Sequence, residues 1–462
     1  MSSRLERSPW VPWGWWAMLA AVLATGLVGH WALATGLLIV LLVHVARPFD
    51  FLVAFILVTG GASFVRGAAG QLTFELRLLT GAILLMLACY VVSIRRQALT
   101  ISRNHLTWPL FLYLVLSIAN ALRGLLCGYS PKWIGLDLMP VLGLASALVV
   151  ANAFEPRRDL RLAVVGVLAV GFANAIVTLS SNKFAPMHKV GVYDAAVPGI
   201  VGLLLVNFSL RSRTPVTALG WIALSLPLFL HQFLTYGRGL WLACLAGLAF
   251  SVLVFTGFGP RSVARWRRSS VVVGTLAVFV LMLGFFLGTQ FLQVAGSRLV
   301  SITRTEYSYE TASNAARLIE YSTVVGLISH SPWLGYGLGY TFLGSSLFGL
   351  RHEQSWVHEN FLLVWLKQGL VGLAVFVWML WTAVTLGVRE AQRPRDYWES
   401  AWLAASAAGT VMLAVLSLSN FPLNVVNPVF LLALLWGGSI AMTREGFVRF
   451  RWFAPGTTGG TP

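Results

Sequence analysis

Apolar runs of roughly 20 residues recur along this chain, and each is long enough for a helix to cross the hydrocarbon core of a membrane. The runs are continuous in Leu, Val, Ala and Gly, whereas the strands of a membrane β-barrel alternate between apolar and polar residues. Hydrophobic residues make up 57% of the chain and charged residues only 11%. The sequence therefore predicts an all-α polytopic membrane protein.

Fourteen apolar runs are predicted to span the membrane. The first two share a short connection at Gly29 and His30, so they form two spans, one long helix or a re-entrant pair. We therefore expect about 12 to 14 transmembrane helices. The predicted spans cover residues 13–28, 29–46, 49–65, 73–94, 106–126, 133–154, 159–180, 195–211, 215–235, 238–256, 270–289, 358–384, 400–418 and 425–442.

One long interruption, residues 290–357, lies between the spans predicted at 270–289 and 358–384. Within it, an amphipathic helix is predicted from Ser313 or Asn314 to about Ser329, and Pro332 follows its end. The expected domains are a first bundle part (1–289), an external catalytic loop (290–357), a second bundle part (358–442) and a cytoplasmic tail (443–462).

Three glycines at alternate positions follow that helix, at residues 335, 337 and 339. A phosphate-binding glycine loop would follow a strand and precede a Lys, and neither is present here. The glycines therefore predict a turn that packs against other elements.

Basic residues gather in short tufts, which fall in alternate connections between the spans. The positive-inside rule places these connections in the cytoplasm. Both termini are then cytoplasmic, and residues 290–357 face outward, into the periplasm of a cell with two membranes. The tufts account for the net charge of +17 without nucleic acid as a partner. They include Arg95, Arg96, Arg103, Arg157, Arg158, Arg161, Arg211, Arg213, Arg261, Arg265, Arg267, Arg268, Arg389, Arg393, Arg395, Arg444, Arg449 and Arg451.

A few charged residues lie within or at the ends of spans on the outward side, namely Glu75, Arg77, Arg123 and Asp137. Ionisable groups at such depth are costly, so they indicate either a function or pairing between helices. The sequence leaves both interpretations open. The excess of positive charge on this side suits an anionic headgroup at the outer leaflet.

A tight turn around Arg238 connects two predicted spans on the outward side. Gly237 and Gly239 remove side-chain bulk on either side of Arg238, so an anion can approach its guanidinium group and the first N–H groups of the next helix. An interfacial Arg beside a Trp, here Trp241, is also a common membrane anchor. Arg238 is therefore a candidate for anion binding or for anchoring.

Arg317 lies on the first turn of the predicted amphipathic helix, and His358 lies at the start of a predicted span with Glu359 beside it. A His side chain titrates near neutral pH, so His358 is a candidate for proton transfer. A lone His at a helix start is ordinarily structural, and the sequence alone leaves this alternative open.

No metal site or other cofactor is predicted. The histidines and nearby carboxylates of the 290–359 stretch match no helical metal-ligand spacing. Cys89, Cys127 and Cys244 are widely spaced and lie in or beside apolar runs, which is typical of buried thiols and not of a disulfide framework.

Taken together, these pieces resemble the O-antigen ligase and O-antigen polymerase superfamily of bacterial envelope glycan enzymes. The resemblance covers roughly residues 215–385, and the rest of the chain agrees only in being multi-spanning. The matching elements are the Tyr236–Trp241 turn, Arg317 with the apolar helix after it, the Pro332–Gly337 turn, and His358 followed by Gly369 and Gly372.

Enzymes of this family transfer a glycan from undecaprenyl pyrophosphate to an acceptor hydroxyl at the outer face of the inner membrane, without a nucleotide sugar or a metal. The resemblance therefore implies that Arg238 and Arg317 hold the pyrophosphate and that His358 assists deprotonation of the acceptor. Charge grows on the leaving pyrophosphate, which guanidinium groups are suited to bind. A positioned base typically accelerates such a step by about 10² to 10⁴ fold.

Polymerase and ligase are the two activities that the resemblance offers. Ligases of the family commonly carry His followed by Asn, Ser or Gln, and later Gly-x-x-Gly-Thr. Here Glu359 follows His358 and Leu373 follows Gly372. These departures and the fourteen-span pattern favour a polymerase of O-antigen, capsule or exopolysaccharide over a ligase. They also leave Glu359 either as a group that orients His358 or as the base itself.

The implied partners are the lipid-linked glycan donor, a glycan or lipid A-core acceptor, the bilayer and, for a polymerase, a chain-length regulator. A transporter or flippase is the alternative outside enzymes. Such proteins place ionisable groups at mid-membrane and show repeated halves. No clear repeat is visible here, and the candidate residues gather at the outer interface.

Overall fold

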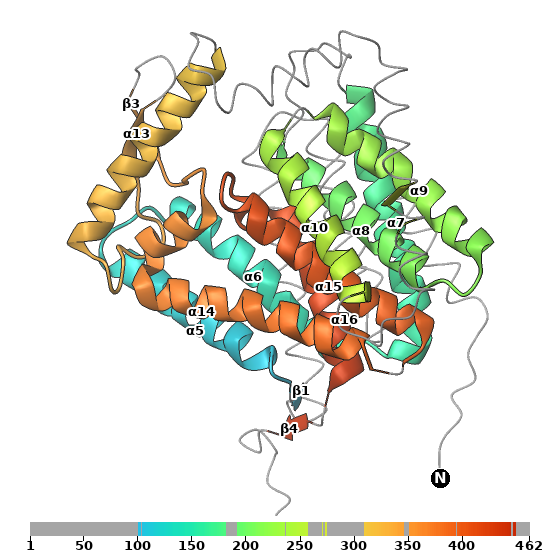
Figure 1. Ribbon diagram of the computed structural model, residues 1–462. Coiled ribbons are helices and arrows are strands. Elements are labelled where there is room, and N and C mark those ends of the chain that lie inside the picture. The colour runs from blue at the N-terminus through green and yellow to red at the C-terminus, as the bar shows by residue number, and fades with distance from the viewer. Residues whose placement is uncertain are drawn as a thin grey trace, which may run out of the picture.

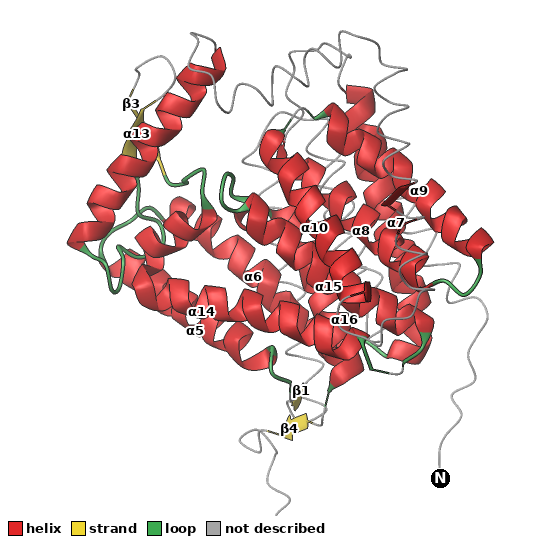
Figure 2. Cartoon of the chain, in the orientation of Figure 1, coloured by secondary structure: helices red, strands yellow, loops and turns green. Residues whose placement is uncertain are grey.

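The computed structural model describes residues 100–102, 104–181, 192–235, 237–256, 270, 273–274, 309–345, 351–393, 395–444 and 447–449. The spans predicted between residues 13 and 94 lie outside this part of the chain. So do most of the span at 270–289 and most of the tail after residue 443. Figures 1 and 2 show the described part as a bundle of helices with two short strand pairs at its ends.

Each helix of the bundle follows one predicted span, with ends that differ by a few residues except at the end of α14. Among the described residues, six helices are long and apolar enough to cross a membrane. The chain is therefore a multi-pass membrane protein. The bundle helices are α5 (Thr107–Leu126), α6 (Pro131–Ala153), α7 (Pro156–Ser181), α8 (Val192–Arg211), α9 (Pro215–Leu234), α10 (Arg238–Thr256), α14 (Asn360–Ala391), α15 (Tyr397–Leu416) and α16 (Val426–Thr443).

Local sequence fixes several of the helix starts. Pro131, Pro156 and Pro215 are the first residues of α6, α7 and α9. Pro suits this position because its fixed φ is helical and the first N–H groups have no partner within the helix. Asp396 caps α15 by accepting a hydrogen bond from the Trp398 N–H at 3.2 Å.

The core of the bundle is built around α8. Every residue from Ala196 to Leu210 is buried, and α7, α9, α10, α15 and α16 pack around it. A helix that is apolar on all sides can be buried in this way or can face lipid, and the contacts of α8 show that it is buried. α6 and α16 form a second close pair, where Gly437 lies against Val150 and a Cβ at Gly437 would stand 2.5 Å from that of Val150.

One end of the bundle gathers several of the described basic residues that are predicted to be cytoplasmic. There, β1 (Thr100–Ser102) pairs antiparallel with β4 (Phe447–Arg449), with Ile101 opposite Val448. The Arg211 side chain donates to Ser400 Oγ at 3.0 Å, which ties α8 to α15 at the same end. The described parts of these connections therefore lie at the same end of the bundle.

The opposite end carries α13 (Tyr309–His330) and a hairpin of β2 (Phe342–Ser345) and β3 (Arg351–Gln354). Figure 1 shows α13 standing beside the bundle, with one of its ends near the start of α14. Its Val324 and Ile328 are buried in a cluster with Val357, Leu363 and Leu366 at the start of α14. The predicted amphipathic helix is therefore present, with a start a few residues earlier, whereas the hairpin was not predicted.

α14 is broken at Gly369, where φ is 69° and ψ is −174°. This differs from the continuous span predicted at 358–384. The carbonyl groups of Leu366 and Lys367 lose their helical partners at the break. They accept instead from the N–H groups of Tyr336 and Gly337, at 2.9 and 2.8 Å. A break of this kind is tolerated in a membrane bundle because a neighbouring segment satisfies the freed backbone groups.

The three alternate glycines make this close contact possible. Gly335, Gly337 and Gly339 have φ of 62°, 97° and 87°, a region that side chains other than hydrogen disfavour. A Cβ at Gly335 would lie 2.6 Å from the Gly369 nitrogen, and one at Gly339 would lie 2.4 Å from Ile134 Cγ1. The prediction of a packing turn is confirmed.

Candidate active site

The turn between α15 and α16, residues 417–424, is contacted by the segments that carry Arg238, Arg317 and His358. It ends in a short 3-10 helix at Pro422–Asn424. The first residue of α14 is docked on this turn, because the Asn360 N–H donates to the Ser417 carbonyl at 3.0 Å. The Asn360 side-chain oxygen accepts in turn from the Leu423 N–H at 3.2 Å. The start of α14 is thereby fixed relative to the turn.

Arg317 reaches the same turn from α13. Its Nη1 donates to the Ser419 carbonyl at 3.3 Å. A guanidinium group has five N–H donors in a planar fork. The carbonyl contact orients the group, and it uses only part of its donor capacity.

Arg238 is the first residue of α10, and the turn that carries it packs on Ser419 as well. A Cβ at Gly239 would lie 2.4 Å from Ser419 Oγ and 3.1 Å from the Asn420 side-chain nitrogen. Glycine at position 239 therefore lets the start of α10 approach the 417–424 turn. Ser419 is the common neighbour of the Arg238 turn and of Arg317.

His358 lies just before α14, and Glu320 of α13 holds it through two contacts. The Nδ1 atom of His358 is 2.7 Å from Glu320 Oε2, and the backbone N–H of His358 donates to Glu320 Oε1 at 2.8 Å. The ring of His358 packs edge-on against Trp356 and Phe421, with centroid distances of 4.7 and 6.2 Å. Phe421 belongs to the 417–424 turn, so the imidazole contacts the same turn as Arg317 and the start of α10.

Glu359 has a different task in this arrangement. It is the N-cap of α14, and its carboxylate oxygens accept from the N–H groups of Phe361 and Leu362. Burial raises the pKa of Glu359, and the two backbone hydrogen bonds oppose this shift. The carboxylate is thus engaged by the helix start, and the contact to the His358 ring comes from Glu320.

Tyr321 lies among the charged groups of this cluster. Burial raises its pKa, the positive charge of Arg317 lowers it, and the negative charges of Glu320 and Glu359 raise it. The phenol therefore stays protonated at neutral pH, and it is available as a hydrogen-bond donor or acceptor.

Sequence reasoning missed Glu320 and the 417–424 turn. A signal for Glu320 was present, because it follows Arg317 by three residues on a predicted helix and residues at that spacing share a face. The 417–424 turn gives no such signal. Its role depends on backbone carbonyl groups and on contacts between segments far apart in the sequence.

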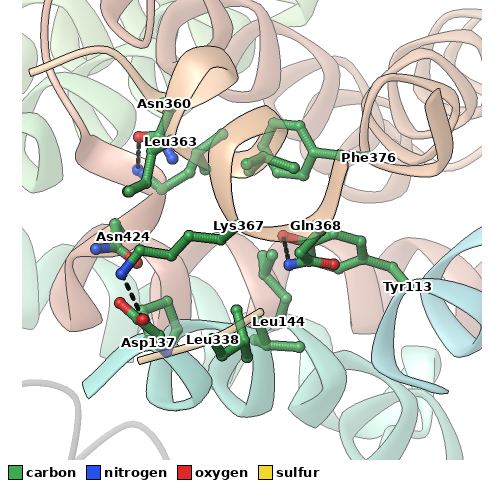
Figure 3. A pocket seen from close by; sticks show the side chains of 14 residues that line it. Tyr113, Asp137, Leu144, Leu338, Asn360, Leu363, Lys367, Gln368, Phe376 and Asn424 are labelled. Carbon is green, nitrogen blue, oxygen red and sulfur yellow. Dashed lines mark hydrogen bonds and ion pairs between the residues drawn. The ribbon is translucent and has the colours of Figure 1, made fainter. Parts of the chain in front are cut away.

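A small cavity of about 30 Å³ lies beside the start of α14, with room for about two water molecules. Figure 3 shows Lys367 pointing at Asp137 across it, with Gln368 turned towards Tyr113. The Gln368 side chain donates to the Tyr113 hydroxyl at 3.3 Å. Asp137 therefore takes part in pairing between helices, one of the two interpretations that the sequence left open.

Arg123, the other described member of that set, donates to the Leu334 carbonyl at 3.0 Å. This contact ties the end of α5 to the turn after α13. Within the described residues, no group of three or more His, Cys, Asp or Glu side chains is placed to hold a metal ion.

A comparison with protein families supports the resemblance. A family model described as O-antigen ligase matches residues 222–377 of the chain. The matched segment includes Arg238, Arg317 and His358, and it falls within the stretch of about 215–385 on which the resemblance rests. No curated protein matches the chain.

Proposed function

We propose that this chain, whose residues 222–377 match the O-antigen ligase family model, is a membrane glycosyltransferase acting on lipid-linked glycans. The proposed donor is a repeat unit on undecaprenyl pyrophosphate. The proposed acceptor is a hydroxyl group of a second glycan. The reaction would take place at the outer face of the bacterial inner membrane, with both chain termini in the cytoplasm.

The observation that supports this proposal best is the convergence on Ser419 and Phe421. The Arg317 guanidinium donates to the Ser419 carbonyl, the turn carrying Arg238 packs on the Ser419 side chain, and the His358 ring packs on Phe421. These contacts support a site that combines two permanently charged groups and one proton acceptor. This is the set of groups that glycosyl transfer from a pyrophosphate carrier requires.

In the proposed step, the acceptor hydroxyl oxygen attacks the anomeric carbon of the donor sugar. The bond between that carbon and the phosphate oxygen breaks, and undecaprenyl pyrophosphate leaves with the electron pair. Arg238 and Arg317 stabilise the charge that grows on the leaving group, because guanidinium groups bind phosphate oxygens bidentately. The Nε2 atom of His358 takes the proton of the hydroxyl group.

We assign the polymerase activity, in which lipid-linked repeat units are joined into O-antigen, capsule or exopolysaccharide. The residues after His358 and Gly372 depart from the ligase pattern, which supports this choice. Transfer of finished glycan to lipid A-core is the second candidate, and the description of the matching family as O-antigen ligase favours it. A polymerase would work beside a chain-length regulator.

The test uses cells that depend on this gene for their surface glycan and express Arg238→Ala, Arg317→Ala or His358→Ala. We expect each change to reduce polymer formation by at least about 10² fold, because each removes a group that acts in the transition state. Extracted glycans are separated on gels, and membrane insertion is checked by immunoblot. Arg393→Ala is the matched control, since Arg393 is exposed at the other end of the bundle.

The same glycans distinguish the two activities. Loss of a polymerase leaves single repeat units that still reach their final acceptor, whereas loss of a ligase leaves full-length glycan on undecaprenyl pyrophosphate. Normal polymer from either Arg variant would remove that residue from the proposed reaction. Stranded full-length glycan would replace the polymerase assignment with the ligase.

A further inference from the structure

We infer that Glu320 is a positioning residue, which fixes the tautomer and the orientation of His358 so that Nε2 faces the acceptor as a base. This inference rests on the proposed function, in which His358 is the proton acceptor. It adds a residue that neither the sequence motifs nor the family match assigns. The geometric basis is the pair of contacts that one buried carboxylate makes with one His residue.

The Glu320 side chain is 8% exposed and the His358 side chain 26% exposed. Oε2 of Glu320 faces the ring Nδ1 at 2.7 Å, and Oε1 faces the backbone N–H of His358 at 2.8 Å. An ionised carboxylate can only accept hydrogen bonds. Both facing atoms of His358 must therefore donate, which places the ring proton on Nδ1 and leaves the lone pair on Nε2.

The two contacts also restrict the ring mechanically. The backbone contact fixes the start of the His358 residue relative to α13, and the ring contact fixes its side-chain torsions. Trp356 and Phe421 bound the ring on its edges. When Nε2 accepts a proton, the adjacent carboxylate stabilises the imidazolium that forms, as in triads where an acidic residue orients a catalytic His.

The other charged or titratable groups near this pair are few among the described residues. Arg317 and Tyr321 lie on α13 close to Glu320, and Glu359 lies at the start of α14 with its oxygens on the helix N–H groups. The residues of the 417–424 turn carry no ionisable side chain. Glu320 is therefore the acceptor that sets the tautomer of His358.

The nearly isosteric Glu320→Gln variant gives a sharp test. Its amide has one acceptor oxygen and one donor nitrogen where the carboxylate has two acceptors. If the amide oxygen takes the backbone N–H, the amide nitrogen faces Nδ1 and donates to it. The ring proton then moves to Nε2, and the base is lost. Glu320→Ala imposes neither tautomer, so a fraction of its rings keeps a lone pair on Nε2.

We therefore expect Glu320→Gln to be at least as damaging as Glu320→Ala, although Gln is much closer to Glu in shape. With purified protein in nanodiscs and a lipid-linked repeat unit as substrate, kcat should fall by about 10² to 10⁴ fold in Glu320→Gln, while KM changes by less than about threefold. Glu320→Asp should recover part of the lost kcat, because it restores an acceptor-only group. Thermal unfolding of each variant reports on folding.

A purely structural role predicts the opposite order, with Gln close to wild type and Ala worst, and with losses that follow Tm. That order would overturn the inference. His358→Ala is assayed beside these variants. If it retains activity, the proposed base is wrong; if it is inactive while Glu320→Gln keeps full kcat, only the role of Glu320 fails. The ¹⁵N shifts of the His358 ring in the wild-type protein give an independent reading, and a proton found on Nε2 would contradict the inference.

Discussion

The Lys367 ammonium group pairs with the Asp137 carboxylate between α14 and α6, and the two side chains are 3% and 5% exposed. The same carboxylate oxygen accepts from the Gly339 N–H at 2.7 Å. One acidic residue thus joins two bundle helices and the glycine turn that fills the α14 break. The pair adjoins the candidate active site, because Lys367 and Asp137 line the same cavity as Asn360, which is bonded to the 417–424 turn.

Removing one member of this pair should destabilise the protein strongly. Asp137→Leu or Lys367→Met leaves an uncompensated buried charge, and the expected loss is about 3 to 5 kcal/mol in the free energy of unfolding. The double variant replaces both charges by apolar groups of similar size, so it should recover most of that loss. Unfolding in detergent measures all three. A double variant as unstable as the worse single variant would show that the hydrogen bond to Gly339 dominates.

Gly369 should not tolerate any side chain. Its backbone conformation is nearly exclusive to glycine, and a Cβ there would lie 2.1 Å from the Trp333 carbonyl oxygen. We expect Gly369→Ala to lower stability by at least about 1 to 3 kcal/mol and to reduce activity by displacing the start of α14.

Gly326→Ala is the matched control for that change. Gly326 lies in the helical part of α13, with open space where a Cβ would stand. Alanine should therefore be neutral or should stabilise by roughly 0.5 to 1 kcal/mol. Equal Tm losses in the two variants would show that the close contact at Gly369 is not what limits substitution.

Glu359→Gln should change the dependence of stability on pH. Burial raises the pKa of Glu359 above its usual 4.5, so the folded protein holds this proton more tightly than the unfolded chain does. The stability from this preference is complete below pH 4.5 and is lost as the pH rises through the folded pKa. Gln cannot ionise and retains one capping oxygen. The variant should therefore gain Tm relative to wild type as the pH rises from about 4 towards neutral. A difference that does not vary with pH would contradict the raised pKa.

Ser419→Gly should restore the activity that is lost when a side chain is added at position 239. Gly239→Ala places a methyl group against Ser419 Oγ and should shift the carbonyl that accepts from Arg317. We expect a fall of about tenfold in polymer formation, which is about 1.4 kcal/mol in the transition state. Adding Ser419→Gly removes the hydroxyl that clashes, and activity should return. If the double variant is as inactive as Gly239→Ala, the contact to Asn420 or the backbone of residue 239 is responsible.

Most of the described bundle follows from residue-level rules. The helix starts at Pro131, Pro156 and Pro215 are local effects of proline, and the apolar run at 195–211 predicts α8 as a span. The break in α14 does not follow in this way. Gly369 alone permits a break, and only the N–H groups of a distant segment make one stable. The β2–β3 hairpin was missed because its strands are short and follow a glycine-rich stretch that reads as loop.

The candidate site also combines features that the sequence predicts with features that depend on distant segments. Arg238, Arg317 and His358 were named from their positions and from the resemblance, and the structure brings their segments together on residues 417–424. The contact between Glu320 and His358 spans 38 residues of sequence, so periodicity cannot reveal it. Glu359, adjacent to the His in sequence, was the more obvious candidate to orient it. The Glu359 carboxylate caps α14 instead, and adjacency in the sequence does not predict this.

The break at Gly369 also affects how deep the start of α14 lies in the membrane. A straight helix of 32 residues would be about 48 Å long, well beyond the roughly 30 Å of hydrocarbon in a bilayer. Residues 370–391 are by themselves roughly 33 Å long and suffice for the crossing. Residues 360–368 then need not lie in the hydrocarbon core and can lie at the level of the lipid headgroups, where phosphate and water are present. In the proposed reaction, Gly369 would thus set the depth at which a carrier lipid presents its sugar to the imidazole.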